Sequence, residues 1–200
     1  MVKIVLDAGH GNNTPGKRTP DGEREWGFND QVVQACISKL ATYENVQVLR
    51  VDDPTGETDV PVWERTAKAN GWNADVYVAV HHNANRGKWG DWTGVETYVM
   101  DSPTVSPISE ELARLVGPRI AKAMGLKDRG VKRANFHVLR ETKMPAILTE
   151  GGFMDSVIDI KALRSKGKLK AQGEALAEVL AVYFKLKPKE ADAKCVRHLL

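Results

Sequence analysis

The sequence lacks the features that mark disulfide-rich, membrane-spanning and nucleic-acid-binding proteins. It has only two cysteines, Cys36 and Cys195, so a disulfide framework is not expected. No apolar run is long enough to cross a membrane, and the first residues lack the basic start and apolar core of a secretory signal. The formal net charge of +3 is too small to indicate a nucleic-acid partner. We therefore expect synthesis in the cytoplasm without a signal peptide, no membrane insertion and no nucleic-acid partner.

The length and the apolar pattern indicate one domain with alternating strands and helices. Two hundred residues with 42% hydrophobic content suit a single globular core. Strands are expected at residues 2–7, 46–51, 76–80, 95–99, 136–139 and 146–149, and helices at 28–41, 61–72, 109–124 (interrupted near Gly117-Pro118) and 168–184. This order predicts an α/β fold: a single domain with a twisted, mostly parallel β-sheet and helices on both faces. We assign residues 1–186 to this domain and residues 187–200 to a linker or tail, and expect a monomer.

Polar side chains follow three of the expected strands. His10 comes after the first strand, His81 and His82 come after the run VYVAV, and Glu150 comes after the run AILT. In open α/β sheets, ligands bind outside the carboxyl ends of the strands, so these side chains are expected on one rim. Imidazoles and carboxylates that converge in this way are typical of a zinc site.

The segment DGEREWGFN supplies candidates for a third protein ligand. Its carboxylates, Glu23 and Glu25, lie between the first strand and the first helix, where either can fold back over the same rim. Three protein ligands leave one coordination position for water, which distinguishes catalytic zinc from structural zinc with four protein ligands. The residues alone leave the choice between the two glutamates open.

Six blocks of the sequence, in order, resemble the zinc-dependent N-acetylmuramoyl-L-alanine amidases, the catalytic-domain family of bacterial autolysins and phage endolysins. The blocks are IVLDAGHG, EWGFN, VAVHHNAN, GVETYV, DRGVKRANFHVLR and PAILTEGGFMD, and the resemblance covers residues 2–184. EWGFN is similar to the family's Glu-x-x-x-Asn segment, which implies Glu25 rather than Glu23 as the ligand. VAVHHNAN is similar to Ser-Ile-His-Ala-Asn-Ala, which implies His81 rather than His82.

The resemblance implies a metal site and a reaction. It implies one zinc ion per chain, bound by His10, Glu25 and His81. It also implies Glu150 as the general base that takes a proton from water and returns it to the leaving amine. The implied partner is bacterial peptidoglycan. The bond cut would be the amide between the lactyl group of N-acetylmuramic acid and L-alanine of the stem peptide.

The chain is expected to be a phage endolysin that is made in the host cytoplasm and acts on the cell wall after release. A bacterial autolysin, or a spore or mother-cell lytic enzyme, is the alternative within the same chemistry. Two other classes stay open: a zinc aminopeptidase or carboxypeptidase, and a non-catalytic wall-binding domain of the same fold. Such peptidases commonly hold paired metals, for which no clear further carboxylate lies on the rim blocks. A non-catalytic domain would be expected to have lost a ligand or the base.

Several other residues near the expected site can be interpreted as supporting either ligand binding or the local structure. We interpret Gly9 and Gly11 as the residues that let the backbone turn so that His10 can reach the metal. Asp7 either accepts a hydrogen bond from a ligand imidazole or holds the turn after the first strand. In the loop NRGKWGDWTG, Trp89 and Trp92 either form a platform for glycan or peptide or pin the loop to the domain. Glu96 lies on an expected strand rather than at the rim, and a role in orienting a ligand or packing beside the site is one interpretation of it.

Overall fold

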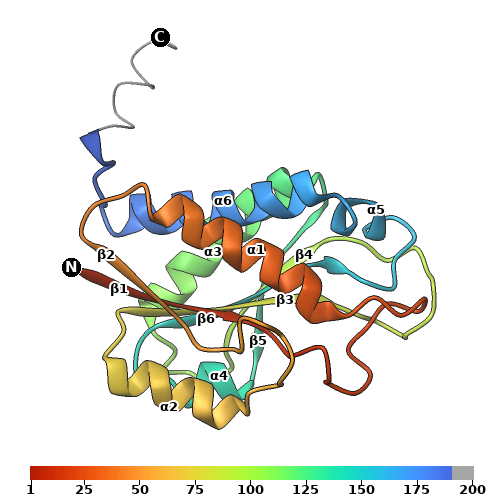
Figure 1. Ribbon diagram of the computed structural model, residues 1–200, viewed down its shortest axis with the longest axis horizontal. Coiled ribbons are helices and arrows are strands. Elements are labelled where there is room, and N and C mark those ends of the chain that lie inside the picture. The colour runs from red at the N-terminus through yellow and green to blue at the C-terminus, as the bar shows by residue number, and fades with distance from the viewer. Residues whose placement is uncertain (191–200) are drawn as a thin grey trace.

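One six-stranded sheet organises the computed structural model, which describes residues 1–190 (Figure 1). The strands are β1 (Val2–Ala8), β2 (Val46–Arg50), β3 (Val76–Asn83), β4 (Val95–Met100), β5 (Asp128–Ala134) and β6 (Ala146–Phe153), in the order β2-β1-β3-β6-β4-β5. The first four strands in this order run parallel, whereas β4 is antiparallel to β6 and β5 is parallel to β4. The predicted fold class, a mostly parallel sheet in one α/β domain, is confirmed.

Helices cover both faces of the sheet. They are α1 (Glu25–Leu40), α2 (Val62–Trp72), α3 (Pro107–Met124), α4 (His137–Arg140), α5 (Ile160–Leu163) and α6 (Lys166–Tyr183). In Figure 1, α1, α3 and α6 lie on one side of the sheet and α2 and α4 on the other. Successive side chains of a strand point to opposite faces, so Ile4 and Leu6 of β1 enter the larger core while Val5 enters the smaller one.

The same alternation decides where the polar strand ends point. His81 of β3 shares its sheet face with Tyr77 and Ala79, and Glu150 of β6 shares its face with Leu148. Both side chains therefore lie on the face that carries α2 and α4, beyond the apolar part of the smaller core. This uncovered end of the face is the position of the candidate site.

The strand expected at residues 136–139 is wrong. The strand in this region is β5, and residues 137–140 form the short helix α4. β5 is an edge strand with mostly exposed, basic positions, so it shows no apolar alternation. Val138 and Leu139 pack into the smaller core from one helical turn, which gives the apolar run that resembles a strand.

The expected interruption of the third helix is also wrong. Helix α3 continues through Gly117 and Pro118. Proline removes one helical hydrogen bond, but packing on β4 holds this part of the helix. A Cβ on Gly117 would lie 3.0 Å from Oγ1 of Thr97, so the glycine allows α3 to approach the strand closely.

The segment after α6 begins with contacts to the domain. The amide of Lys189 donates to the carbonyl of Thr42 at 2.9 Å, and the amide of Glu44 donates to the carbonyl of Lys187 at 2.8 Å. The boundary at residue 186 stays a prediction, and residues 191–200, with Cys195, lie outside the described part of the chain. Within residues 1–190, no helix combines the length and apolarity needed to cross a membrane.

Candidate metal centre

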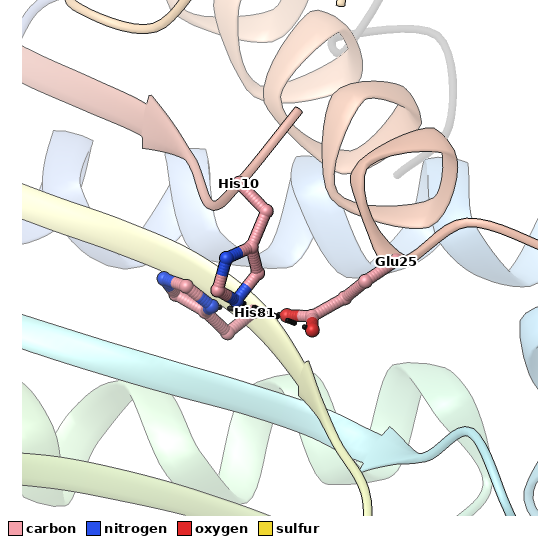
Figure 2. A group of neighbouring side chains, drawn as sticks. All are labelled: His10, Glu25 and His81. Carbon is pink, nitrogen blue, oxygen red and sulfur yellow. Dashed lines mark hydrogen bonds and ion pairs between the residues drawn. The ribbon is translucent and has the colours of Figure 1, made fainter. Parts of the chain in front are cut away.

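Three side chains from separate parts of the chain converge near the carboxyl ends of β1 and β3. Figure 2 shows His10, Glu25 and His81 turned toward one another. Nε2 of His10 lies 3.3 Å from one carboxylate oxygen of Glu25, and Nδ1 of His81 lies 2.9 Å from the other. One ligand atom from each of the three residues lies within 4.8 Å of the other two. The fold thus brings together the three predicted ligands.

Helix α1 positions the carboxylate. Glu25 is its first residue and is buried, and the positive end of the helix dipole favours an anion there. One turn later, Nδ2 of Asn29 donates to Glu25 at 3.3 Å and to the carbonyl of Gly9 at 3.0 Å, which links α1 to the loop after β1. Glu23 instead forms an exposed ion pair with Arg164 at 2.6 Å. The geometry therefore favours Glu25 over Glu23.

The backbone at His10 is held in an unusual conformation. His10 has a φ of 68°, in the left-handed region, whereas Gly9 and Gly11 have no positive φ. The interpretation that these glycines supply the turn is therefore wrong. A Cβ on Gly9 would lie 2.0 Å from the ring of His81, and one on Gly11 would lie 2.7 Å from the amide nitrogen of Asp59. The two glycines provide space, and His10 itself makes the turn.

The buried guanidinium of Arg65, on α2, holds this turn. It donates to the carbonyl of His10 at 2.9 Å, to the carbonyl of Ala8 at 2.9 Å and to the carboxylate of Asp7 at 2.5 Å. Asp7 also accepts a hydrogen bond of 2.6 Å from the hydroxyl of Tyr77. Asp7 thus holds the turn through Arg65, and no hydrogen bond joins it to a candidate ligand within the described residues. The sequence pattern of the helix did not predict that Arg65 holds the turn at His10.

His81 and His82 point to opposite faces of the sheet. The ring of His82 enters the larger core, where Nδ1 lies 2.8 Å from Oδ1 of Asn29 and Nε2 lies 3.3 Å from Oε1 of Gln172. Burial lowers the pKa of His82 to about 4. The imidazole of His82 is therefore a core group, as expected from the choice of His81 as the ligand.

Glu150 lies beside His81 on the neighbouring strand. The two residues are paired in the register of β3 and β6. The Oε2 atom of Glu150 is buried and has no hydrogen-bond partner in the described structure. Burial raises the pKa of Glu150 to about 8; the charge of His81 opposes this effect and that of Glu25 adds to it. A buried carboxyl oxygen without a partner marks a place for a ligand or water that contributes hydrogen bonds.

The electrostatics of the three converging side chains suit a cation. Burial lowers the pKa of His10 to about 4, against the attraction of Glu25, so this imidazole is neutral at pH 7. Burial disfavours charge on His81 too, but the hydrogen bond to Glu25 outweighs burial and raises its pKa. For Glu25, burial favours the neutral acid, and the hydrogen bond with His81 overcomes burial and lowers its pKa. An ionised carboxylate and two ring nitrogens form a set of donors for a divalent cation.

Glu96 orients a loop rather than a candidate ligand. Its buried carboxylate accepts hydrogen bonds from Nδ2 of Asn83 at 3.1 Å, from the hydroxyl of Tyr98 at 2.7 Å and from Nε of Arg129 at 2.7 Å. Asn83 also accepts a hydrogen bond from the amide of Ala84, so it fixes the chain just after His81. Glu96 is in register with Glu150 across β4 and β6.

The loop after β3 is attached to the domain through one carboxylate. Asp155, fully buried, accepts hydrogen bonds from the indole of Trp92 at 2.7 Å and from the amides of Asn85, Arg86 and Gly87 at 2.8–2.9 Å. Trp92 therefore pins the loop. Trp89 is 40% exposed, with the guanidinium of Arg164 5.9 Å from its ring, so of the two indoles in this loop it is the one that faces solvent.

A pocket of about 270 Å³ opens over the converging side chains. Its lining is formed by His10, Pro15, Gly16, Lys17, Glu25, His81, His82, Asn83, Ala84, Glu150 and Met154. Ligand donors, a carboxyl group with an unpaired oxygen and an amine therefore share one solvent-accessible cavity. This arrangement can bind a cation and bring a substrate to the side chain of Glu150.

Sequence comparisons match the chain to one family over nearly its whole length. A family model described as N-acetylmuramoyl-L-alanine amidase matches residues 4–181. The N-acetylmuramoyl-L-alanine amidase CwlM of Bacillus licheniformis is 37% identical over 192 residues, which are 96% of this chain and 72% of CwlM. The endolysin of Bacillus phage SPP1 is 34% identical over 197 residues, which are 96% of this chain and 70% of the endolysin.

Solved structures agree with the sequence matches. An N-acetylmuramoyl-L-alanine amidase from Clostridium difficile 630 superposes with a TM-score of 0.83 at 30% identity, over 92% of this chain and 97% of that protein. The catalytic domain of CwlV, an N-acetylmuramoyl-L-alanine amidase from Bacillus (Paenibacillus) polymyxa, gives a TM-score of 0.81 at 27% identity, over 94% of this chain and all of that domain.

Proposed function

This chain belongs to the N-acetylmuramoyl-L-alanine amidase family, and from that premise we propose that it is a zinc-dependent peptidoglycan hydrolase. The reaction is hydrolysis of the amide between the lactyl group of N-acetylmuramic acid and L-alanine of the stem peptide. The observation that carries the proposal is the convergence of His10, Glu25 and His81 beside Glu150, in one pocket of a chain whose relatives are named for this reaction.

The donor set fits zinc. Zinc takes imidazole nitrogen and carboxylate oxygen at about 2.0–2.2 Å, which places neighbouring tetrahedral ligand atoms roughly 3.3–3.5 Å apart. The nitrogen-to-oxygen distances of 3.3 Å for His10 and 2.9 Å for His81 are close to that spacing. In our proposal these two imidazoles and Glu25 hold one zinc ion. When bound, zinc supplies Lewis-acid chemistry, in which the pKa of water falls and an amide carbonyl is polarised.

Glu150 is proposed as the general base and acid. Its Oε2 atom is buried and free to accept a proton, and its carboxyl is paired in register with His81. The pKa of about 8 in the metal-free protein makes this carboxyl a group that can hold a proton near neutral pH. Glu150 can therefore take a proton from water and deliver it to the departing amine of L-alanine.

The arrangement of the other carboxylates argues against a two-metal peptidase. His10, Glu25 and His81 form the one group of three metal-binding side chains found within residues 1–190. Glu96, which lies in register with Glu150, is engaged by Arg129, Asn83 and Tyr98. It is therefore not available to bridge a second cation. A purely wall-binding role is disfavoured because the three proposed ligands and the proposed base are all present together.

Phage origin and action on the wall after release form part of the same proposal. The relatives include a phage endolysin, which supports this assignment, and also Bacillus enzymes, one of them a sporulation-specific amidase, which fit the alternative. Both origins use the same reaction, and a monomer stays the expected state.

A product assay tests the proposal. The full chain, loaded with zinc, is incubated with purified peptidoglycan, and new amino groups and new reducing sugars are measured separately. Hydrolysis of the lactyl amide releases the amino group of L-alanine and no reducing sugar. Chelation should stop the release and added zinc should restore it. New reducing ends, or new amino groups of residues other than L-alanine, would assign a different bond and contradict the proposal.

A further inference from the structure

Lys17 is the one Lys or Arg among the residues that line the site pocket. Its neighbours in the lining are neutral, carboxylic or imidazole side chains. Two arginines on nearby segments are engaged elsewhere: Arg164 binds Asp21 and Glu23, and Arg24 donates to the carbonyl of Thr14. Within residues 1–190, no hydrogen bond or ion pair engages the ammonium group of Lys17.

The backbone fixes the place of Lys17 even though its side chain is exposed. Gly16 turns the chain with a φ of 74°, a conformation that favours glycine. The amide of Glu25 then donates to the carbonyl of Lys17 at 3.1 Å, so the main chain of Lys17 is bonded directly to the first residue of α1. The main chain of Lys17 is thus fixed beside a proposed ligand, and its exposed side chain starts at the rim of the pocket.

The carboxylates of the pocket do not satisfy this amine. Both oxygens of Glu25 are taken by His10 and His81, and Glu150 lies half-buried on β6 with its buried Oε2 atom unpartnered. An unpaired ammonium beside a site for a cation makes the mouth of the pocket positive, and this charge attracts an anion. The bond that the proposed function cleaves is a neutral amide, so the anion must come from a flanking part of the substrate.

The stem peptide supplies such an anion on the amine side of the bond. Its second residue, D-glutamate, follows L-alanine directly and is linked onward through its side-chain carboxyl, so its α-carboxylate is free. Two extended residues span roughly 7 Å, and a lysine side chain presents its ammonium on a flexible four-carbon stem. A carboxylate two residues from the scissile amide is therefore within reach of an amine on the rim of the same pocket.

We propose that Lys17 is a specificity-determining residue, which binds a stem-peptide carboxylate on the amine side of the scissile amide. This inference rests on the proposed function. This contact makes the enzyme prefer peptidoglycan with free stem carboxylates to peptidoglycan in which these carboxylates are amidated.

The experiment divides one preparation of peptidoglycan into two samples. In one sample the carboxylates are converted to amides with carbodiimide and ammonia, and the other sample is left untreated. Release of L-alanine amino groups is measured at a series of wall concentrations with the zinc-loaded full chain. A charge-assisted hydrogen bond is worth about tenfold in this comparison. The wild type should therefore show a half-saturating concentration about tenfold lower on untreated wall than on amidated wall, with a similar maximal rate.

Three variants complete the test. Lys17→Met should raise the half-saturating concentration on untreated wall about tenfold, to the value for amidated wall, and should bind zinc as the wild type does. Lys17→Arg keeps the charge and should keep the preference. Lys68→Met, on the exposed side of α2, is the matched control and should behave like the wild type.

The outcomes separate this inference from the proposed function. If the wild type releases no L-alanine amino groups from untreated wall, the proposed function fails. If it cleaves untreated and amidated wall equally well, or if Lys17→Met keeps the preference, the role of Lys17 is overturned. An equal loss of maximal rate on both walls in Lys17→Met would also overturn it, because that result assigns Lys17 to the chemical step.

Discussion

The guanidinium of Arg65 donates a hydrogen bond of 2.9 Å to the carbonyl oxygen of His10, whose imidazole faces Glu25. The same buried group binds Asp7 and the carbonyl of Ala8. It therefore fixes the backbone on both sides of Gly9 and holds His10 at its positive φ. The position of the imidazole depends on a residue of α2 that does not touch it.

Replacement of Arg65 by methionine should weaken zinc binding at least tenfold and destabilise the fold by about 3–5 kcal/mol, because the Asp7 carboxylate is left buried without its partner. Chelator competition measures the affinity and urea unfolding the stability. In the double variant Arg65→Met/Asp7→Asn, no fully buried charge is left unpaired, because the other partner of Arg65, Asp59, is partly exposed, so stability should recover in part while zinc affinity stays low. Wild-type zinc affinity in both variants would show that Arg65 does not position His10.

Replacement of Gly9 by alanine should displace a proposed ligand directly. The new Cβ would lie 2.0 Å from the ring of His81, which must move away from Glu25. We expect at least tenfold weaker zinc binding and a loss of about 1–3 kcal/mol in unfolding free energy from the overlap. Gly71→Ala on α2 is the matched control, since a Cβ there has no neighbour within 4 Å. Equal zinc affinities of the two variants would contradict the packing of His81 against Gly9.

Replacement of Glu150 by glutamine tests the proposed base. The amide retains the shape of the side chain but cannot accept a proton from water, so kcat should fall about 10²–10⁴-fold. Zinc content and thermal stability should stay close to those of the wild type, because Glu150 is not one of the three proposed ligands. Turnover close to that of the wild type would remove Glu150 from this role.

Zinc binding should release about one proton at pH 6 and become weaker as the pH falls. In the metal-free protein, the hydrogen bond to Glu25 raises the pKa of His81 above its ordinary value of about 6.5, so at pH 6 this ring is protonated and must lose its proton to bind the metal. His10, with a pKa of about 4, is already neutral. Affinity should therefore rise with pH through the pKa of His81 and level off above it.

Calorimetry in buffers of different ionisation enthalpy counts the protons released. The measurement is made in Glu150→Gln, so that the proton held by Glu150 in the metal-free protein does not contribute. Release of no proton would contradict the protonated state of His81, and release of two would contradict the neutral state of His10.

Replacement of Asp155 by asparagine should loosen the loop after β3. The carboxylate accepts from three backbone amides and the indole of Trp92, and loss of its charge should cost about 2–3 kcal/mol at pH 7. Burial favours the neutral acid, but these hydrogen bonds outweigh it and lower the pKa of Asp155. The stabilisation is therefore complete above the unfolded pKa of about 3.9 and is lost as the pH falls through the lower folded value.

The difference in unfolding free energy between the wild type and Asp155→Asn should thus be constant from pH 5 to 8 and shrink below pH 4. Urea unfolding across this range measures it. Asp91→Asn, an exposed change in the same loop, is the control and should cost little at any pH. A difference that persists unchanged to pH 3 would mean that the charge of Asp155 is not responsible.

The sequence predicted those parts of the fold that depend on apolar burial. β1, β3 and β6 are central strands whose buried runs are visible in the sequence, and their carboxyl ends carry His10, His81 and Glu150. β5 was not predicted, because an exposed edge strand needs no apolar face. The choice of Glu25 over Glu23 came from the family resemblance. The structural difference is that α1 begins at Glu25 and leaves Glu23 in the preceding loop, and the sequence did not define that boundary.

Contacts between elements distant in the sequence could not be predicted. Arg65 lies in a helix whose pattern shows only a surface segment, yet its guanidinium is buried against the loop after β1. The space required by His81 at Gly9 depends on the packing of β1 beside β3, which no local pattern contains. Composition likewise could not distinguish Trp92, held by Asp155, from the more exposed Trp89.

The position of β6 in the sheet links the completion of the fold to the completion of the site. The last strand within residues 1–190 is inserted between β3 and β4, at the centre of the sheet, and it carries Glu150. A chain that ends before residue 146 leaves the facing edges of β3 and β4 open and has no proposed base. In our proposal, one strand therefore completes both the sheet and the site, so a truncated chain that lacks β6 is expected to release no amino groups from peptidoglycan.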